Sequence, residues 1–291
     1  MDPKGARAYG MALVTVAAVL WSTAGLFVRL LDLDVWTMLA WRSLFAALSL
    51  ASVVAIQNGQ HTIRAVRAMG RPGLAAIPIA VVSMGSYVIA LKLTTVANVM
   101  VVYATVPFVA AGVALLWIGE RAAFRVLLAS AIALIGILIM AGSATRPQDI
   151  AGNGVAFLMT LAFGTQLVMA RRYPSLEMSS INAIAAALCA VICWPLTAAA
   201  MPSPLQLVIL ALFGMTTTAL AYILFLTGGR HIPSGEAGLI GLIDVVLAPF
   251  WVWLAFGEQP GRAAIIGGGL VLASVLWYLA GQRWTKAARM S

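Results

Sequence analysis

The chain of 291 residues is 63% hydrophobic and 9% charged, with a net charge of +9. Soluble domains carry about 25% charged residues, so this composition excludes a water-facing globular surface and indicates an integral membrane protein in a lipid bilayer. The sequence has no long hydrophilic stretch, which excludes a soluble catalytic module. The first apolar run is long enough to span a bilayer and lacks a small-residue cleavage site, so we expect no cleaved signal peptide.

Apolar runs of about 20 residues, the length that crosses a bilayer, recur along the chain and are separated by turn-forming residues such as Asn58-Gly59 and Pro260-Gly261. In chain order, we predict ten transmembrane helices: residues 9–31, 35–57, 72–91, 96–118, 124–143, 151–171, 179–200, 204–227, 235–256 and 262–282. The linkers between them are short, so we expect sequential helices to be antiparallel neighbours. The predicted fold is an all-α integral membrane protein.

The positions of the basic residues predict how the chain crosses the membrane. With the N-terminus in the cytoplasm, the inner side holds 13 of the 18 Lys and Arg residues: Lys4, Arg7, Arg64, Arg67, Arg71, Arg121, Arg125, Arg171, Arg172, Arg230, Arg283, Lys286 and Arg289. The outer side holds Arg29, Lys92, Arg146 and Arg262, and Arg42 falls inside a span. Cytoplasmic loops carry the excess of Lys and Arg, so both termini are predicted to be cytoplasmic. The same bias explains most of the net charge without a nucleic-acid partner.

The sequence also repeats itself. Two offsets align the chain with itself: Gly119-Glu120 with Gly257-Glu258 at 138 positions, and Arg29 with Arg171 at 142 positions. We therefore predict two copies of one five-helix unit, residues 1–145 and 146–291. Because five is odd, the second copy enters the membrane from the opposite side, which is the inverted repeat common among secondary transporters. Each Gly-Glu pair is then the turn between the fourth and fifth helices of its unit.

Three segments carry a resemblance to a known family: LKLTTVANVMVVYATVPFVAAGVALLWIGERA (91–122), WRSLFAALSL (41–50) and LWSTAGLFVRL (20–30). Over essentially its whole length the chain resembles the drug/metabolite transporter superfamily with paired EamA-type domains, and within it YddG-like bacterial amino-acid exporters. The resemblance implies a protein that is not an enzyme. It implies export of small metabolites, foremost neutral and aromatic amino acids, across the bacterial inner membrane by alternating access. The second copy departs from the family pattern, because Val245 stands in the place of Pro107.

A solute site in such a protein lies near mid-membrane, usually where helices are interrupted. Pro107 lies in the middle of the fourth span and leaves the carbonyl of Tyr103 without its helical donor. Pro249 does the same to Val245 in the ninth span. Either helix break presents a carbonyl to a substrate or is a structural kink, which membrane helices tolerate.

Asp244 is the most informative ionisable residue. It lies about 9 residues into the ninth span, or roughly 13 Å deep at 1.5 Å per residue. A carboxylate at that depth costs several kcal/mol unless it is paired, hydrated or protonated. We therefore expect Asp244 either to carry a coupling proton or to form an ion pair with Arg42, which lies roughly 10 Å deep in the second span.

Polar, aromatic and Met side chains within the spans supply the other substrate-binding candidates: Trp21, Trp41, Met84, Tyr87, Asn98, Tyr103, Gln166 and Tyr222. Membrane aromatics also serve as interface belts. As cavity walls, these side chains offer the hydroxyl, amide and ring surfaces that a zwitterionic amino acid needs.

Alternatives and absences complete the prediction. A sugar-phosphate or nucleotide-sugar carrier would need several basic cavity residues to meet phosphate, and the spans offer mainly Arg42. A non-transporting protein such as an intramembrane enzyme would need a nucleophile and a base, and no such pair is visible. The sequence lacks a GxxxxGK[ST] motif, an HExxH motif and a cluster of His and acidic residues, so we expect no ATP motor, no cofactor and no metal. One chain already holds both repeats, so a monomer can suffice.

Overall fold

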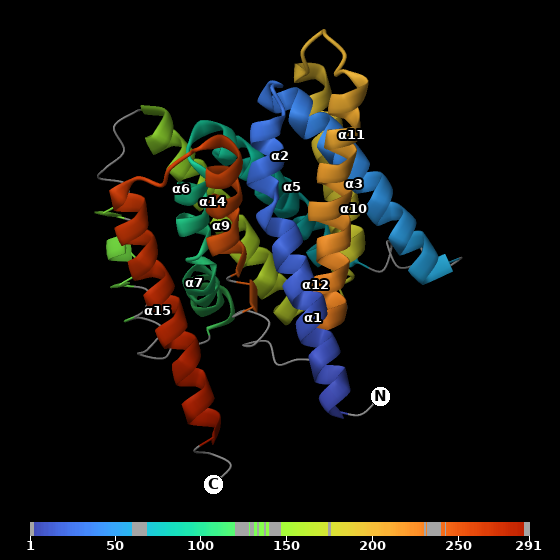
Figure 1. Ribbon diagram of the computed structural model, residues 1–291. Helices are drawn as coiled ribbons and strands as arrows, with labels where there is room; N and C mark the ends of the chain where they lie inside the picture. Colours follow the sequence, from blue (N-terminus) through green and yellow to red (C-terminus); the bar gives the residue numbers. More distant parts are fainter. Residues whose placement is uncertain are drawn as a thin grey trace.

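The structure, a computed structural model, describes residues 3–59, 69–119, 128, 131–132, 134–136, 138–139, 147–173, 176–229, 231, 240–241 and 243–287. These residues form helices and connecting turns and contain no strand. The helices are α1 (Pro3–Ser22), α2 (Ala24–Leu30), α3 (Val35–Asn58), α5 (Gly70–Leu93), α6 (Val96–Tyr103), α7 (Val106–Ile118), α9 (Pro147–Arg172), α10 (Met178–Cys193), the 3₁₀ turn η2 (Trp194–Leu196), α11 (Pro204–Phe213), the π-helical segment η3 (Gly214–Leu220), α12 (Ala221–Gly229), α14 (Ile243–Phe256) and α15 (Arg262–Ala287) (Figure 1).

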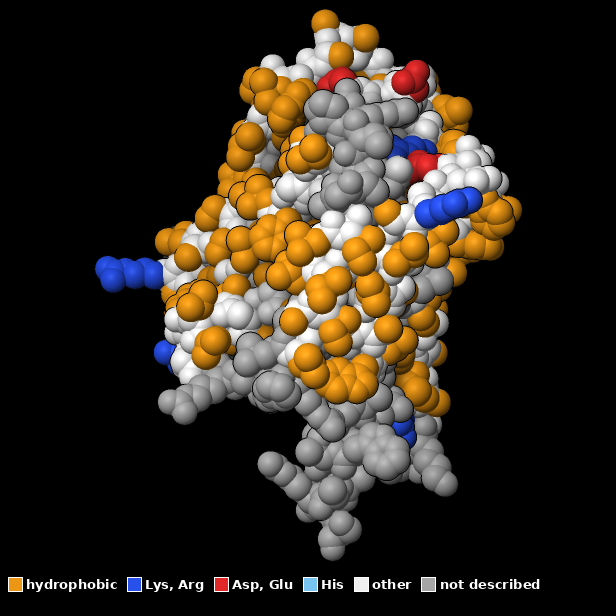
Figure 2. All heavy atoms as spheres, turned by 90° about the vertical axis from the view of Figure 1, so that its left-hand side faces the viewer, with side chains coloured by type: hydrophobic (Ala, Val, Ile, Leu, Met, Phe, Trp, Pro, Cys, Tyr) orange, Lys and Arg blue, Asp and Glu red, His pale blue; other side chains and the backbone are white. Residues whose placement is uncertain are grey.

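The described helices have the length and composition of membrane spans. Seven segments are long and apolar enough to cross a bilayer: Gly5–Leu30, Val35–Gln57, Gly70–Leu93, Val96–Ile118, Asp149–Ala170, Met178–Leu196 and Pro204–Gly229. Ile243–Phe256 and Ile265–Ser274 are shorter apolar helices at the ninth and tenth predicted spans. Most of the predicted fifth span, residues 124–143, lies outside the described residues. Hydrophobic side chains dominate the middle of the face shown in Figure 2, so the predicted all-α membrane fold is confirmed.

Contacts at the two ends of the bundle show that α1 and α9 run in opposite directions. The segment α1–α2 runs toward Arg29, which donates to the carbonyl of Thr94. α9 begins beside this point, because Asp149 in its first turn accepts from the Thr94 hydroxyl at 3.0 Å. α9 ends near the opposite face, where Met169 packs in one cluster with Met69. We call the end that holds Arg29, Thr94 and Glu258 the Glu258 end.

Two further helix pairs show the same inversion. α3 begins at the Glu258 end, whereas α10 ends there, because the backbone N–H of Ala198 just beyond α10 donates to the hydroxyl of Thr37 at the start of α3. α5 ends at the Glu258 end, whereas α12 ends at the other, where Gly228 packs against the backbone of Gly10 in α1. The two halves are therefore inverted, as predicted. The predicted boundary between residues 145 and 146 lies outside the described residues.

Three spans are interrupted, two of them where the sequence did not indicate it. The first span breaks at Thr23 between α1 and α2, and its hydroxyl donates to the carbonyl of Leu20 at 2.7 Å. The fourth breaks at Ala104 and Thr105, so that Pro107 falls in the first turn of α7. There proline is tolerated because its missing N–H would have no helical acceptor. The eighth span contains η3, and π-helical turns occur frequently at functional sites.

The prediction of a helix break at Pro249 is wrong. Pro249 lies inside α14, which continues from Ile243 to Phe256. A proline removes one backbone hydrogen bond and kinks a helix, but neighbouring helices and local adjustment can satisfy the freed carbonyl within a membrane protein. The inverted halves therefore differ here, since only the span of the first half is interrupted next to its proline.

Gly119 and Gly257 end matching helices of the two halves in the same conformation. Gly119 follows α7 with φ 71°, and Gly257 follows α14 with φ 67°. Glycine adopts this left-handed conformation without the penalty that a Cβ imposes. The predicted role of each glycine in a turn is thus explained by its backbone geometry, whereas Glu120 lies outside the described residues.

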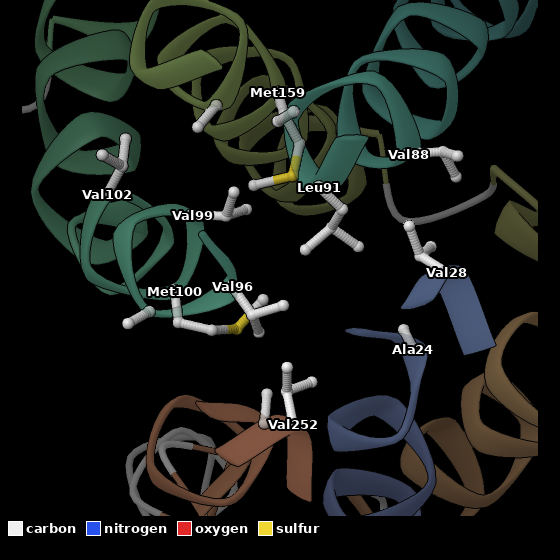
Figure 3. Packing of buried hydrophobic residues seen from close by; sticks show 14 of the residues in the cluster. Ala24, Val28, Val88, Leu91, Val96, Val99, Met100, Val102, Met159 and Val252 are labelled. Atoms are coloured by element: carbon white, nitrogen blue, oxygen red, sulfur yellow. The ribbon is translucent and has the colours of Figure 1, made fainter. Parts of the chain in front are cut away.

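The main hydrophobic core joins both halves near the Glu258 end. It combines residues of α2, α5 and α6 with Met159 of α9 and Val252 of α14, and Figure 3 shows Leu91, Val96 and Met159 pointing into this cluster from three helices. Gly25 permits the close approach of α2 to α6, because a Cβ there would lie 2.8 Å from a methyl group of Val96. This packing places the site described next between the halves.

Candidate functional site

A cavity lies between the two halves. Its lining residues come from nine helices and from η3: Trp21, Ala24, Arg42, Ser83, Met84, Tyr87, Met100, Tyr103, Met159, Phe163, Gln166, Asn182, Thr217, Thr218, Tyr222 and Asp244. Its volume is about 150 Å³, and an engineered cavity of about this size accommodates benzene. The cavity is therefore large enough for a small molecule and is shared by both halves.

Most of the predicted site residues meet in this cavity. Six of the substrate-binding candidates line it, as do both charged candidates: Trp21, Met84, Tyr87, Tyr103, Gln166, Tyr222, Arg42 and Asp244. They come from spans one, two, three, four, six, eight and nine of the predicted order. The fold thus brings together residues that lie as far apart in the sequence as Trp21 and Asp244.

Trp41 and Asn98 lie elsewhere. The ring of Trp41 packs against that of Trp194, with centroids 5.2 Å apart. It precedes Arg42 by one residue and so points about 100° away around the helix. The side-chain amide of Asn98 donates to the hydroxyl of Thr94 at 3.0 Å, at the Glu258 end rather than in the cavity.

The cavity also contains polar residues that were not candidates from the sequence. Asn182 is an isolated amide in an alanine-rich helix, and its Nδ2 donates to the carbonyl of Met178. Thr217 and Thr218 belong to three consecutive threonines in an apolar span. Both patterns break an otherwise apolar span, which is the signal that could have identified them.

Arg42 is buried and held from two sides. Its side chain is 5% exposed, its Nη2 donates to the hydroxyl of Thr218 at 2.9 Å, and its guanidinium carbon lies 4.6 Å from the ring centroid of Phe213. Its Nε has no hydrogen-bond partner. Gly214 makes this arrangement possible, because a Cβ there would lie 2.5 Å from the carbonyl oxygen of Arg42. The start of η3 therefore packs directly on the α3 backbone at the arginine.

Asp244 is equally buried, at 5% exposure, in the first turn of α14. Its Oδ1 has no hydrogen-bond partner. In the part of the chain that the structure describes, no ion pair joins Asp244 to Arg42. The ion pair with Arg42, one of the two roles expected for Asp244, is therefore not formed in this conformation, although both residues line one cavity. Tyr87 lines the same cavity as both charges.

Aromatic rings form much of the remaining wall. Tyr103 packs against Phe163 with ring centroids 5.8 Å apart, and Trp21 packs against Phe225 at 5.0 Å. Tyr103 is also the last residue of α6, at the break in the fourth span. Ring faces and edges offer apolar surface with directional electrostatics, so this wall suits the side chain of a solute better than its charged groups.

Polar contacts join the two halves at the Glu258 end. Arg29 Nε lies 2.8 Å from Glu258 Oε2, and the two Nη atoms of Arg29 donate to the carbonyls of Leu91 and Thr94 at 2.7 and 2.9 Å. Glu258 Oε1 in turn accepts from the backbone N–H of Val96 at the start of α6. This one pair links α2, the α5–α6 turn and the α14–α15 turn. No local pattern in the sequence indicates this ion pair.

No metal centre is visible within the described ranges, where no group of three or more His, Cys, Asp and Glu residues could hold an ion. The site is instead a charged and aromatic cavity enclosed by inverted helical halves. That combination is typical of secondary transporters, which hold their solutes at the interface between repeats.

The comparisons with known proteins agree. The EamA-like transporter family matches the chain twice, over residues 8–142 and 150–280. The chain belongs to this family and hence to the drug/metabolite transporter superfamily, which confirms the resemblance to paired EamA-type domains.

Two relatives show how far the similarity extends. An uncharacterized transporter of Archaeoglobus fulgidus is 26% identical over 276 residues, covering 92% of this chain and 95% of the relative. A solved crystal structure at 17% identity covers 91% of this chain and 94% of its own, with a TM-score of 0.62. The second likeness is one of fold.

Proposed function

We propose that this protein is a secondary transporter that exports small metabolites, mainly neutral and aromatic amino acids, across the bacterial inner membrane by alternating access. The observation that carries the proposal is the cavity between the inverted halves, because it combines aromatic walls with two buried charges of opposite sign. Inverted-repeat transporters hold their solutes at this interface and rock one repeat against the other around the site.

The charge of the lining favours a solute without net charge. Among the lining residues there is one arginine, one aspartate and no lysine or histidine. An amino-acid zwitterion carries one charge of each sign, so it can match this lining. A sugar phosphate or nucleotide sugar brings a dianionic or polyanionic group, which favours several cationic partners and is repelled by a carboxylate. The carrier of phosphorylated sugars therefore remains the weaker alternative.

An intramembrane enzyme is the alternative of a different class. The lining offers hydroxyl groups at Ser83, Thr217 and Thr218, and Asp244 is its one carboxylate. The Thr217 hydroxyl donates to the carbonyl of Phe213 and the Thr218 hydroxyl accepts from Arg42, so neither is hydrogen-bonded to a base. This arrangement supports solute binding rather than nucleophilic catalysis.

Asp244 is also our candidate for coupling transport to protons. A buried carboxylate inside a membrane protein commonly marks a proton or ion pathway, and Oδ1 of Asp244 has no partner to hold it in one protonation state. A single chain supplies every residue of the cavity, so we propose that the monomer is sufficient for transport.

Counterflow in proteoliposomes that contain only the purified protein tests the function. We expect vesicles loaded with unlabelled phenylalanine, leucine or another neutral amino acid to accumulate labelled phenylalanine transiently. Vesicles loaded with glucose 6-phosphate should not. Efficient exchange of the sugar phosphate together with no exchange of amino acids would contradict the proposal.

A further inference from the structure

Two buried charges of opposite sign share the cavity without pairing with each other. Arg42 and Asp244 are each 5% exposed, and each keeps one buried polar atom, Nε or Oδ1, without a hydrogen-bond partner. Leaving a charged group buried and unpaired is among the most costly arrangements in a protein. A cavity that keeps both charges apart is therefore suited to an occupant that satisfies both.

The arginine is positioned to bind an anion. Its Nη2 is held by Thr218 and its face by Phe213, so the guanidinium is fixed before a ligand arrives. A guanidinium has five N–H donors in a planar fork that matches a carboxylate. The Nε of Arg42 is one of these donors and has no hydrogen-bond partner.

The aspartate is suited to a cation. An ionised carboxylate accepts hydrogen bonds and donates none, so the unpartnered Oδ1 of Asp244 calls for a donor such as an ammonium group. Tyr87 lines the same cavity as Asp244 and Arg42. Its ring thus lines the space that a dipolar ligand would occupy.

We propose that Arg42 binds the carboxylate and Asp244 binds the ammonium group of a zwitterionic amino acid, whose side chain lies against the aromatic wall. This assignment rests on the proposed function and names the groups that recognise the substrate. It predicts that the protein binds an amino acid more tightly than an analogue that lacks either charged group. A ligand without the amine leaves Asp244 unpaired, and a ligand without the carboxylate leaves Arg42 unpaired.

Three ligands with the same ring test the assignment: phenylalanine, 3-phenylpropanoate, which lacks the amine, and 2-phenylethylamine, which lacks the carboxylate. Each is added as an inhibitor of labelled phenylalanine counterflow. For the original protein we expect either analogue to inhibit about tenfold or more weakly than phenylalanine, the effect of losing one charge-assisted hydrogen bond.

In the variants Asp244→Asn and Arg42→Gln, inhibition should no longer depend on the amine or on the carboxylate of the ligand, respectively. With Asp244→Asn, inhibition by phenylalanine should weaken at least about tenfold, whereas inhibition by 3-phenylpropanoate should not weaken. With Arg42→Gln, inhibition by phenylalanine should weaken by a similar factor, whereas inhibition by 2-phenylethylamine should not weaken. This is a double-mutant cycle between protein and ligand groups, which isolates each pairing.

Matched controls and a second readout keep the test independent of folding. Asp32→Asn and Arg172→Gln remove the same charges at exposed positions and should leave all three inhibition constants unchanged. If counterflow by a cavity variant is too slow to measure, the shift in its melting temperature with each of the three ligands gives the same comparison.

The outcomes separate this inference from the proposed function. If the original protein exchanges no amino acid, both fail. If it exchanges phenylalanine but each variant weakens inhibition by all three ligands equally, the assignment of the subsites is overturned and the proposed function stands. The same holds if Asp244→Asn retains the preference for the amine, because Asp244 then does not bind the ammonium group, whether or not it couples transport to protons.

Discussion

Glu258, in the second half of the chain, forms an ion pair with Arg29 in the first half, with Nε and Oε2 2.8 Å apart. Each partner also satisfies a helix terminus. Arg29 donates to the carbonyl of Leu91 at the end of α5, and Glu258 accepts from the N–H of Val96 at the start of α6. Anions at helix N-termini and cations at C-termini are favourable, so the pair stabilises both ends of the α5–α6 turn while it joins the halves.

Loss of this pair should loosen the Glu258 end. Glu258→Gln removes a charge-assisted interaction of about 1.5–3 kcal/mol, so the end should open more often and admit reagents to the cavity. We expect a cysteine introduced by Met84→Cys, with Cys189 and Cys193 replaced by alanine, to react at least about tenfold faster with an impermeant thiol reagent added on that side.

The matched control for Glu258→Gln is Asp32→Asn, which removes an exposed acid from the same end of the molecule. Its reaction rate should equal that of the parent. An unchanged rate in the Glu258→Gln variant would mean that the ion pair does not hold this end closed.

Gly257 should tolerate replacement poorly although space surrounds it. Its φ of 67° is left-handed, and no atom lies within 4 Å of a Cβ placed there. The cost of Gly257→Ala is therefore conformational, about 1–2 kcal/mol, and the melting temperature of the purified protein should fall. Gly261→Ala, equally free of close contacts and without a positive φ, should change it little. Equal melting temperatures for the two variants would refute this account of the turn.

Gly214 should also tolerate replacement poorly, but for a steric reason. A Cβ there would lie 2.5 Å from the Arg42 carbonyl oxygen and 2.9 Å from the backbone nitrogen of Ala46, so Gly214→Ala must push η3 away from α3. Overpacking costs about 1–3 kcal/mol, and displacement of Arg42 should also reduce phenylalanine counterflow. Gly112→Ala, where nothing lies within 4 Å, should be neutral or stabilising. Normal stability and transport in Gly214→Ala would contradict the packing described.

We predict the orientation of the bundle in the membrane from the basic bias and from the contacts at its ends. Met201, which is 74% exposed, follows α10 at the Glu258 end, whereas His231 lies at the opposite end beside Tyr9, with ring centroids 5.8 Å apart. In a background without Cys189 and Cys193, we expect Met201→Cys to react with an impermeant reagent in intact cells. His231→Cys should react only after permeabilisation, because we predict that its end faces the cytoplasm. The reverse pattern would invert the topology.

The fold could be predicted from the sequence because its signals are local and repeated. The length of each apolar run predicts a membrane span. The two Gly-Glu pairs mark equivalent turns, as the similar φ angles of Gly119 and Gly257 show. Residues that attract attention inside an apolar span, such as Tyr87 and Asp244, do line the cavity. A polar side chain in a membrane helix needs a polar environment, so its occurrence in an apolar span predicts that it faces the interior of the bundle.

The remaining features depend on packing that no local pattern encodes. Trp41 and Arg42 are neighbours in sequence, yet one faces Trp194 and the other the cavity. Which of the two faces the cavity is set by the rotation of α3 against its neighbours. The pair Arg29 and Glu258 is separated by 229 residues, and their counterparts by the repeat offsets, Glu120 and the side chain of Arg171, lie outside the described residues.

Transport through the cavity is the central claim, and Tyr103→Ala tests it most directly. The measurement is the initial rate of phenylalanine counterflow in proteoliposomes, compared with that of Trp253→Ala, which removes a ring that is 48% exposed outside the cavity. Because Tyr103 lines the aromatic wall, we predict a rate lowered about tenfold, the loss of roughly 1.4 kcal/mol of binding, with the variant still folded by size-exclusion chromatography. Trp253→Ala should retain the original rate. An unchanged rate for Tyr103→Ala would contradict the claim that the substrate passes through this cavity.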